Sequence, residues 1–176
     1  LVILPGGEFY VTNFDTNNHY ESNILRIEKY DSAKVWTAVL FDKDQNGYAY
    51  VKRFPMEATP RRQNFLGENP DNELLLLTDT AYPRIKVTMG GVDDFRDPIE
   101  LDAEEFIGVK SFKARGKRIT TLNVAEVVEL EPLRFPEEPN GEEADENGEI
   151  IDEDPDAGKS QQDVADEMTG QMHLFD

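Results

Sequence analysis

The chain of 176 residues carries 37 acidic side chains against 18 lysines and arginines, which gives a formal net charge of −19 and an isoelectric point near 4.4. It contains no cysteine, which excludes disulfides and thiolate metal sites and fits a reducing cytoplasm. Apolar runs such as residues 74–77 are too short to cross a bilayer, and an acidic chain can bind a polyanion only through a local basic patch.

The first 135 residues are predicted to form β-structure almost throughout. Turn residues separate short runs rich in apolar and β-branched side chains, and Asn46-Gly47 supplies the positive φ angles of a hairpin turn. Only residues 102–106 favour a helical turn. We predict an all-β sandwich, barrel or propeller. In chain order, the expected strands cover residues 1–4, 8–12, 23–29, 34–41, 48–54, 73–78, 84–89, 106–112, 117–122 and 124–130.

A faint internal repeat supports the propeller among these alternatives. Residues 1–11 resemble residues 74–87, because each has an apolar run, a turn and a second strand. Repeated β units are typical of propeller-like folds. The alternative is that two unrelated hairpins resemble each other.

The charge divides the chain into two parts. Residues 136–176 hold 15 acids and one base, Lys159, and few large apolar side chains. Such a composition predicts a disordered acidic tail after a single domain of residues 1–135. The chain starts in a predicted strand without an initiator methionine, so we expect it to be a fragment of a longer protein.

The sequence lacks the usual signs of a catalytic or metal site. It has no nucleophile motif, phosphate-binding loop or His-Glu metal motif, and its histidines are His19 and His173 alone. Residues 42–47 match the opening of a calcium-binding EF-hand loop, but Arg53 stands where the closing glutamate should be. We therefore expect a hairpin turn there.

The most informative segment is a basic strip that contains no acid, residues 109–120. In extended structure Lys113 and Arg115 would share one face, and Phe112 and Ala114 the other. The strip is a candidate phosphate-binding surface, or alternatively an edge strand that its cations protect from aggregation. Its five cations are Lys110, Lys113, Arg115, Lys117 and Arg118, and a second cluster that could extend it comprises Lys52, Arg53, Arg61 and Arg62.

Residues 108–120, Gly-Val-Lys-Ser-Phe-Lys-Ala-Arg-Gly-Lys-Arg-Ile-Thr, resemble the last blade motif of the C-terminal domain of bacterial type IIA topoisomerase A subunits. Residues 1–15, 24–31 and 51–54 are similar to the topoisomerase IV form of that subunit. The resemblance implies a β-pinwheel with exchanged strands, of which residues 1–135 would hold two to three blades at the end of a longer array. It also implies that the cations of the strip belong to a rim that binds duplex DNA.

The same resemblance sets expectations about the parent protein. The parent would pass one duplex through another with ATP and Mg²⁺, both handled elsewhere, as a heterotetramer with a second A subunit and two B subunits. It would act in chromosome segregation, in the cytoplasm and at the nucleoid. The Gln-Arg-Arg-Gly-Gly-Lys-Gly box of gyrase is absent, which makes topoisomerase IV the closer match. No tyrosine follows an arginine, as the family's catalytic tyrosine does, so no DNA cleavage is expected from this fragment.

Two further expectations concern partners. Residues 171–175 resemble the Gln-x-x-Leu-Phe peptides that dock on the bacterial sliding clamp, in which Gln171, Leu174 and Phe175 would make the contacts. The alternative is that this end folds back onto its own domain. The rival interpretation of the whole chain is an acidic all-β protein-interaction module that does not bind DNA.

Overall fold

The computed structural model describes residues 1–137, and the chain divides after Pro136, so that Leu1–Pro136 forms one unit. This unit is nearly all β, as predicted, with the single short helix α1 (Ala103–Phe106) and the 3₁₀ turns η1 (Lys43–Gln45) and η2 (Gly91–Asp93). The strands are β1 (Val2–Ile3), β2 (Glu8–Tyr10), β3 (Arg26–Ile27), β4 (Val35–Asp42), β5 (Tyr48–Pro55), β6 (Gln63–Asn64), β7 (Glu73–Thr78), β8 (Arg84–Met89), β9 (Ile99–Asp102), β10 (Lys117–Thr120) and β11 (Val124–Leu130).

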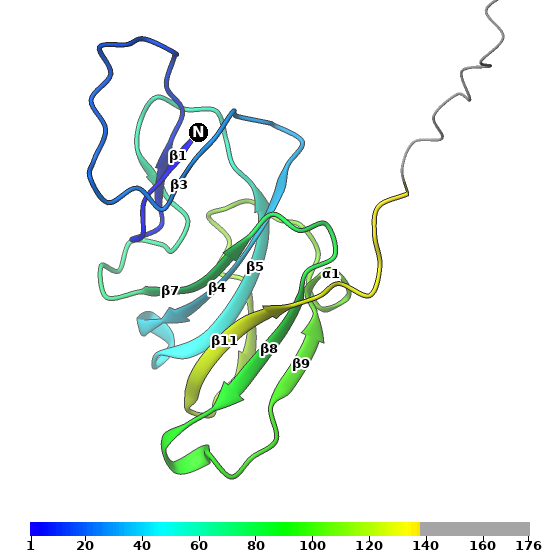
Figure 1. The fold of residues 1–176 in the computed structure, drawn as a ribbon. Helices are drawn as coiled ribbons and strands as arrows, with labels where there is room; N and C mark the ends of the chain where they lie inside the picture. The colour runs from blue at the N-terminus through cyan, green and yellow to red at the C-terminus, as the bar shows by residue number, and fades with distance from the viewer. Residues whose placement is uncertain (138–176) are drawn as a thin grey trace, which may run out of the picture. The chain divides into compact units, whose positions relative to one another are not determined.

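The strands form three antiparallel sheets, which we name A, B and C in chain order (Figure 1). Sheet A has the order β3-β1-β2-β6, sheet B the order β10-β5-β4-β7, and sheet C the order β11-β8-β9. Each sheet is built around one hairpin, and none of the three closes into a barrel. A short connection suffices for each hairpin because its strands are antiparallel.

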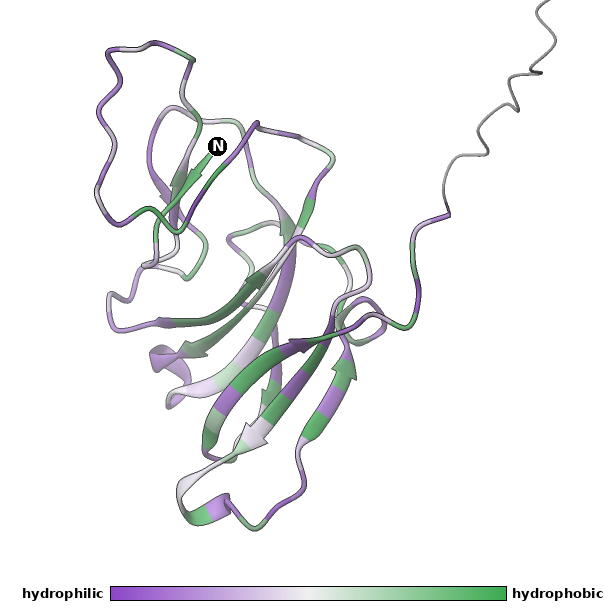
Figure 2. Cartoon of the chain, in the orientation of Figure 1, coloured by the Kyte–Doolittle hydropathy of each residue, from purple (hydrophilic) through white to green (hydrophobic). Residues whose placement is uncertain are grey.

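Sheet B buries both of its faces. Trp36 and Leu40 of β4 belong to a first core shared with sheet A, in which Phe9 is fully buried. Val39, also in β4, points the other way, into a second core with Ile85 of sheet C. A strand buried on both faces requires a near-continuous apolar run, and Figure 2 shows β4 and β7 as mostly hydrophobic.

Sheet C, in contrast, buries one face only. Ile85 and Val87 of β8 are fully buried in the second core, while Lys86 between them lies on the opposite face. Arg84 on that face forms an ion pair of 2.6 Å with Glu100 of β9. The alternation is visible along β8 and β9 in Figure 2 and is typical of a sheet with one solvated side.

Two short strands complete sheets that precede them in the chain. β6 follows the hairpin of sheet B but pairs with β2 of sheet A, with Asn64 opposite Glu8. β10 follows the hairpin of sheet C but pairs with β5 of sheet B, with Lys117 opposite Val51. The sheets are therefore joined by exchanged strands as well as by their cores.

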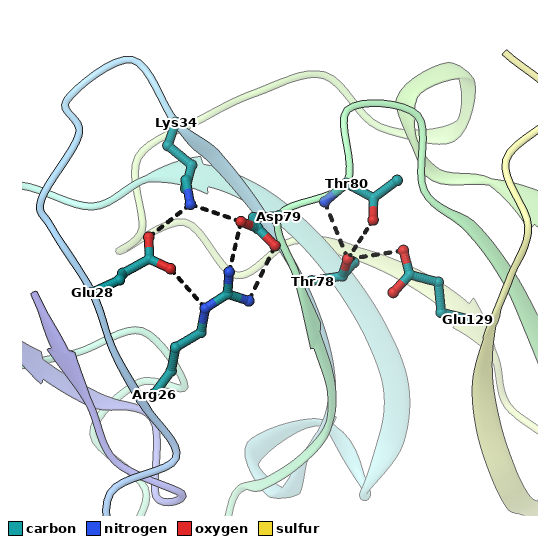
Figure 3. Close-up of polar contacts among 7 residues, drawn as sticks. All are labelled: Arg26, Glu28, Lys34, Thr78, Asp79, Thr80 and Glu129. Carbon is teal, nitrogen blue, oxygen red and sulfur yellow. Dashed lines mark hydrogen bonds and ion pairs between the residues drawn. The ribbon is translucent and has the colours of Figure 1, made fainter. Parts of the chain in front are cut away.

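A cyclic network of ion pairs links sheet A to sheet B (Figure 3). Arg26 of β3 contacts Glu28 at 2.7 Å and Asp79, which follows β7, at 2.8 Å. Lys34, just before β4, contacts the same two carboxylates at 2.7 Å each. The Arg26 guanidinium and the Lys34 ammonium also lie 4.9 and 5.2 Å from the centre of the Trp36 ring. Two cations and two anions thus neutralise one another beside Trp36, a residue of the first core.

A smaller polar contact joins sheet B to sheet C. The Thr78 hydroxyl at the end of β7 lies 2.8 Å from the Glu129 carboxylate of β11, and it accepts a hydrogen bond of 3.1 Å from the Thr80 N–H (Figure 3). This contact and the ion-pair network lie at consecutive residues, Thr78 and Asp79. The chain that leaves β7 is therefore fixed to both neighbouring sheets.

The predicted strand over residues 106–112 is wrong. Asp102 caps α1 instead, because its carboxylate accepts hydrogen bonds from the Glu104 and Glu105 N–H groups at 2.9 and 3.3 Å. Residues 107–116 then run as an irregular loop with a turn at Ser111–Ala114. The helical turn expected at residues 102–106 is confirmed by α1.

The hairpin turn between β4 and β5 is confirmed. Asn46 and Gly47 have φ angles of 58° and 70°, and η1 lies just before them.

Within residues 1–137 the structure places no three acidic, histidine or cysteine side chains together so that they could hold a metal ion. Strands β6 and β9 were not predicted.

The ion-pair network predicts a pH-dependent contribution to stability. Burial alone would raise the pKa of the Asp79 carboxyl, but hydrogen bonds from Lys34 and Arg26 outweigh it and hold this pKa below 3.8. The contribution is therefore full above about pH 4 and is lost as the pH falls through the lowered pKa. We expect Asp79→Asn to reduce the free energy of unfolding by about 1 kcal/mol at pH 7, measured by urea denaturation.

The difference between Asp79→Asn and wild type should shrink at pH 3. Asp71→Asn is the matched control, because Asp71 is exposed and forms no ion pair among the described residues. Equal effects of the two substitutions at pH 7 would contradict the assigned role of the network.

Candidate nucleic-acid interface

The basic strip is held against sheet B at defined points. The Lys110 N–H donates a hydrogen bond of 2.9 Å to the Arg53 carbonyl of β5. Phe112 enters the first core, where it is 2 % exposed and packs edge-on against Phe9 with ring centres 5.2 Å apart. The strip then continues into β10, which pairs with β5. These contacts fix the backbone from which the cations project.

Gly116 allows the strip to approach β5 closely. It has a φ of +96°, and a Cβ added there would lie 2.4 Å from the Val51 carbonyl oxygen. Any other residue would be strained by the φ angle and would collide with the main chain. The glycine is therefore a structural requirement of the strip.

All five cations of the strip are exposed. Phe112 is buried while Lys113 and Arg115 face solvent, which is the expected alternation, although a turn and not a strand produces it. Among residues 1–137, Arg115 is the one strip cation with a carboxylate partner, Asp42 at 3.4 Å. Lys117 donates a hydrogen bond of 3.1 Å to the Phe106 carbonyl and lies 4.1 Å from the centre of that ring. Four exposed positive charges are thus not neutralised by an acid within the described residues.

Two members of the second cluster are buried. Lys52 is 4 % exposed, and its Nζ donates hydrogen bonds of 2.6 and 2.5 Å to the Phe65 and Phe112 carbonyls. Arg53 is 7 % exposed and points to the other side of β5, where its guanidinium donates to the Ala81 carbonyl at 3.4 Å. Both side chains thus point into the interior of the domain, on opposite sides of β5, and neither belongs to the exposed surface. This corrects the expectation that they could extend the strip.

Burial changes the protonation chemistry of both side chains. It lowers the pKa of the Lys52 ammonium from 10.5 to about 8, although the Asp42 carboxylate acts in the opposite direction. It also lowers the pKa of the Arg53 guanidinium, against the charges of Glu104 and Asp102. The Lys52 ammonium also joins the strip to the segment after β6, because it donates to the Phe112 carbonyl of the strip and to the Phe65 carbonyl just after β6.

The other two members of the cluster are exposed. Arg61 forms no ion pair among the described residues. Arg62 forms ion pairs with Glu8, at 3.7 Å, and with Glu21, and it lies 5.4 Å from the centre of the Tyr10 ring. Arg62 is therefore largely neutralised by its neighbours.

The structure brings Arg62 and the strip to one groove of about 580 Å³. Lys113 and Arg115 line one part of it and Arg62 another. Acidic side chains, including Asp44 and Glu68, line it as well. The groove is thus mixed in charge, and the unneutralised cations lie on the strip itself.

Two further expectations concern membrane spans and the end of the chain. No helix within residues 1–137 is long and apolar enough to cross a membrane. The C-terminal peptide with Gln171, Leu174 and Phe175 lies outside the described residues, as does nearly all of the acidic tail.

The buried ammonium of Lys52 gives a testable pH dependence. The pKa of this ammonium is about 8 in the folded chain, whereas its ordinary value is 10.5. Between these two pH values the unfolded chain therefore binds more protons than the folded chain. The free energy of unfolding, compared with that of a variant that lacks the Lys52 ammonium, therefore rises with pH across this range. We expect the unfolding free energy of wild type minus that of Lys52→Met to increase by on the order of 1–3 kcal/mol between pH 7 and pH 10.

Urea denaturation of both proteins at the two pH values measures this difference. The same comparison with Lys113→Met, which removes an exposed lysine, should give no such increase. A wild-type advantage that does not change with pH would show that Lys52 titrates normally.

Comparison with known proteins gives one finding. A family model described as Topoisomerase C-terminal domain, Bacteroidota, matches residues 1–131. No curated protein and no solved structure matches the chain. The matched residues include all three sheets and the whole basic strip. The chain therefore belongs to the family of topoisomerase C-terminal domains of the Bacteroidota.

Proposed function

We propose that the basic strip binds the phosphate backbone of duplex DNA. The observation that supports this most is the set of exposed cations between residues 110 and 118, of which Arg115 alone has a carboxylate partner among residues 1–137. They project from a backbone fixed by Phe112, Gly116 and the pairing of β10 with β5. Membership of a topoisomerase family makes DNA the natural polyanion.

The binding we propose is electrostatic and independent of base sequence. Cations on a loop and an edge strand meet phosphates without an element that could enter a groove and read base edges. Local concentration of positive charge matters here, because the chain as a whole is strongly acidic. The described residues of this domain would hold and orient DNA while cleavage occurs in another part of the parent protein.

The parent we propose is a topoisomerase IV A subunit. It would work with a second A subunit and with B subunits, with ATP and Mg²⁺ bound outside this domain, at the nucleoid in the cytoplasm. The similarity of residues 1–15, 24–31 and 51–54 to the topoisomerase IV form supports this subtype. The domain would then bias which duplex is presented for passage during chromosome segregation.

A charge-reversal experiment tests the DNA proposal. Lys110, Lys113 and Arg118 have no carboxylate partner among the described residues, so their change to Glu should leave folding intact. We expect the triple variant to lose about tenfold or more of its affinity for a duplex at low salt, because phosphate contacts release counterions. Fluorescence polarisation with two unrelated duplex sequences measures the affinity, and the thermal midpoint checks folding.

The matched control changes Lys29, Lys43 and Lys86 to Glu, which alters the net charge equally at positions outside the strip that likewise form no ion pair among the described residues. Equal losses in the two triple variants would mean that net charge and not the strip determines binding. An absence of wild-type binding at low salt would instead support the acidic protein-interaction module.

The C-terminal peptide is proposed as a second contact, with the sliding clamp. A peptide of residues 168–176 should bind purified clamp with a dissociation constant in the micromolar range, about −8 kcal/mol or weaker. The ordering of a free chain keeps such an affinity modest. Leu174→Ala with Phe175→Ala should abolish binding in isothermal titration, whereas Thr169→Ala should not. The clamp contact is refuted if the wild-type peptide gives no heat at high clamp concentration.

A further inference from the structure

The buried ammonium of Lys52 lies in contact with the basic strip. Its Nζ donates hydrogen bonds of 2.5 Å to the Phe112 carbonyl of the strip and 2.6 Å to the Phe65 carbonyl. A Cβ added at Gly116 would lie 3.1 Å from the Lys52 Cβ, so the aliphatic part of the side chain also lies against the strip. The side chain is 4 % exposed, and its charge is therefore almost fully removed from water.

The groove of about 580 Å³ beside the strip connects this buried charge to the surface. Lys52 lines the groove together with Lys113 and Arg115, which are exposed. A phosphate held by these two exposed cations would lie at a groove that has Lys52 in its wall. The field of a charge is screened less in the interior of a protein than in water, so such a phosphate would act on the buried ammonium.

Asp42 links Lys52 to Arg115 electrostatically. The Asp42 carboxylate is 5 % exposed, and its Oδ2 lies 3.4 Å from the Arg115 Nε. Its negative charge acts to raise the pKa of the Lys52 ammonium, although burial lowers this pKa by more. A phosphate that draws the Arg115 guanidinium toward itself would leave more of the Asp42 charge to act on Lys52. This second effect has the same sign as the direct field of the phosphate.

The other charged groups at the groove come from three further segments. Arg62 precedes β6, Asp44 lies in η1 and Glu68 follows β6. Carboxylates, guanidinium groups and exposed ammonium groups ordinarily keep their charge between pH 7 and pH 9. Among the described residues that line this groove, Lys52 is therefore the group that we expect to change its charge in that range.

We propose that Lys52 is coupled to DNA binding through its proton: it makes no contact with DNA, but it takes up a proton when phosphates bind at the strip. This inference rests on the DNA contact proposed above. A bound phosphate favours the charged form of a nearby amine, so the complex binds more protons than the free domain wherever the free amine is partly neutral. The affinity for DNA should therefore fall as the pH rises through the pKa of Lys52, which is about 8.

Calorimetry measures this proton directly. The chain is titrated with a duplex at low salt and pH 8.5, in two buffers whose ionisation enthalpies differ, and the difference in heat gives the number of protons taken up. We expect an uptake of about half a proton per chain, and an affinity about fivefold lower at pH 9 than at pH 7 by fluorescence polarisation.

Two lysine variants separate the buried charge from the exposed charges. Lys52→Met should bind the duplex without proton uptake and with equal affinity at the two pH values, because methionine does not titrate. Lys113→Met is the matched control, since it removes an exposed cation of the strip and should weaken binding while the proton uptake remains. The thermal midpoint checks the folding of both variants, and the pH profile of the wild type tests the inference without either of them.

Three results would count against the coupling, and they are distinguishable. Wild-type binding without proton uptake, at equal affinity at pH 7 and pH 9, would overturn the inference and leave the DNA contact standing. Uptake that persists in Lys52→Met would assign the proton to another group and overturn the inference as well. If the wild type binds no duplex at either pH, the DNA contact itself is wrong, and the inference fails with it.

Discussion

The burial of sheet B on both faces is the constraint from which the rest of the domain follows. A sheet with two apolar faces needs a partner on each side, and sheets A and C are those partners. Trp36 and Val39 lie in the same strand but in different cores, so neither core can form without this sheet. The near-continuous apolar run of β4 is therefore a requirement of its central place.

The basic strip depends on the same arrangement. Phe112 occupies the first core between sheets A and B, and the buried Lys52 ammonium of β5 donates a hydrogen bond to the Phe112 carbonyl. The cations on either side of Phe112 are thus placed by apolar burial and by a buried charge, while they themselves remain in solvent. Positive groups that are positioned before they meet a ligand lose less side-chain and backbone freedom on binding. The acidic net charge of the chain makes such local placement necessary for any contact with phosphate.

The sequence predicted most of the strands but less of the site. Residues 73–78 and 84–89 form strands with the predicted bounds, because apolar and β-branched runs between turn residues carry a strong local signal. β6 consists of Gln63 and Asn64, which show no pattern, and only its pairing with β2 makes it a strand. The segment 106–112 misled the prediction because the Asp102 cap and the burial of Phe112 together outweigh its β-like composition. The burial of Lys52 and Arg53 could not be foreseen either, since it requires knowing that both faces of β5 are covered.

The exchanged strands also determine the order in which the domain can fold. Sheet A is incomplete until β6 emerges after the hairpin of sheet B, and sheet B is incomplete until β10 emerges after the hairpin of sheet C. On a ribosome, each sheet must therefore wait with an open edge for residues that belong to the next unit. Pairings between distant residues, such as Lys117 with Val51, raise the contact order and slow folding. A nascent chain stopped between two units would expose an unpaired β5 or β2, a template for aggregation that the completed domain conceals.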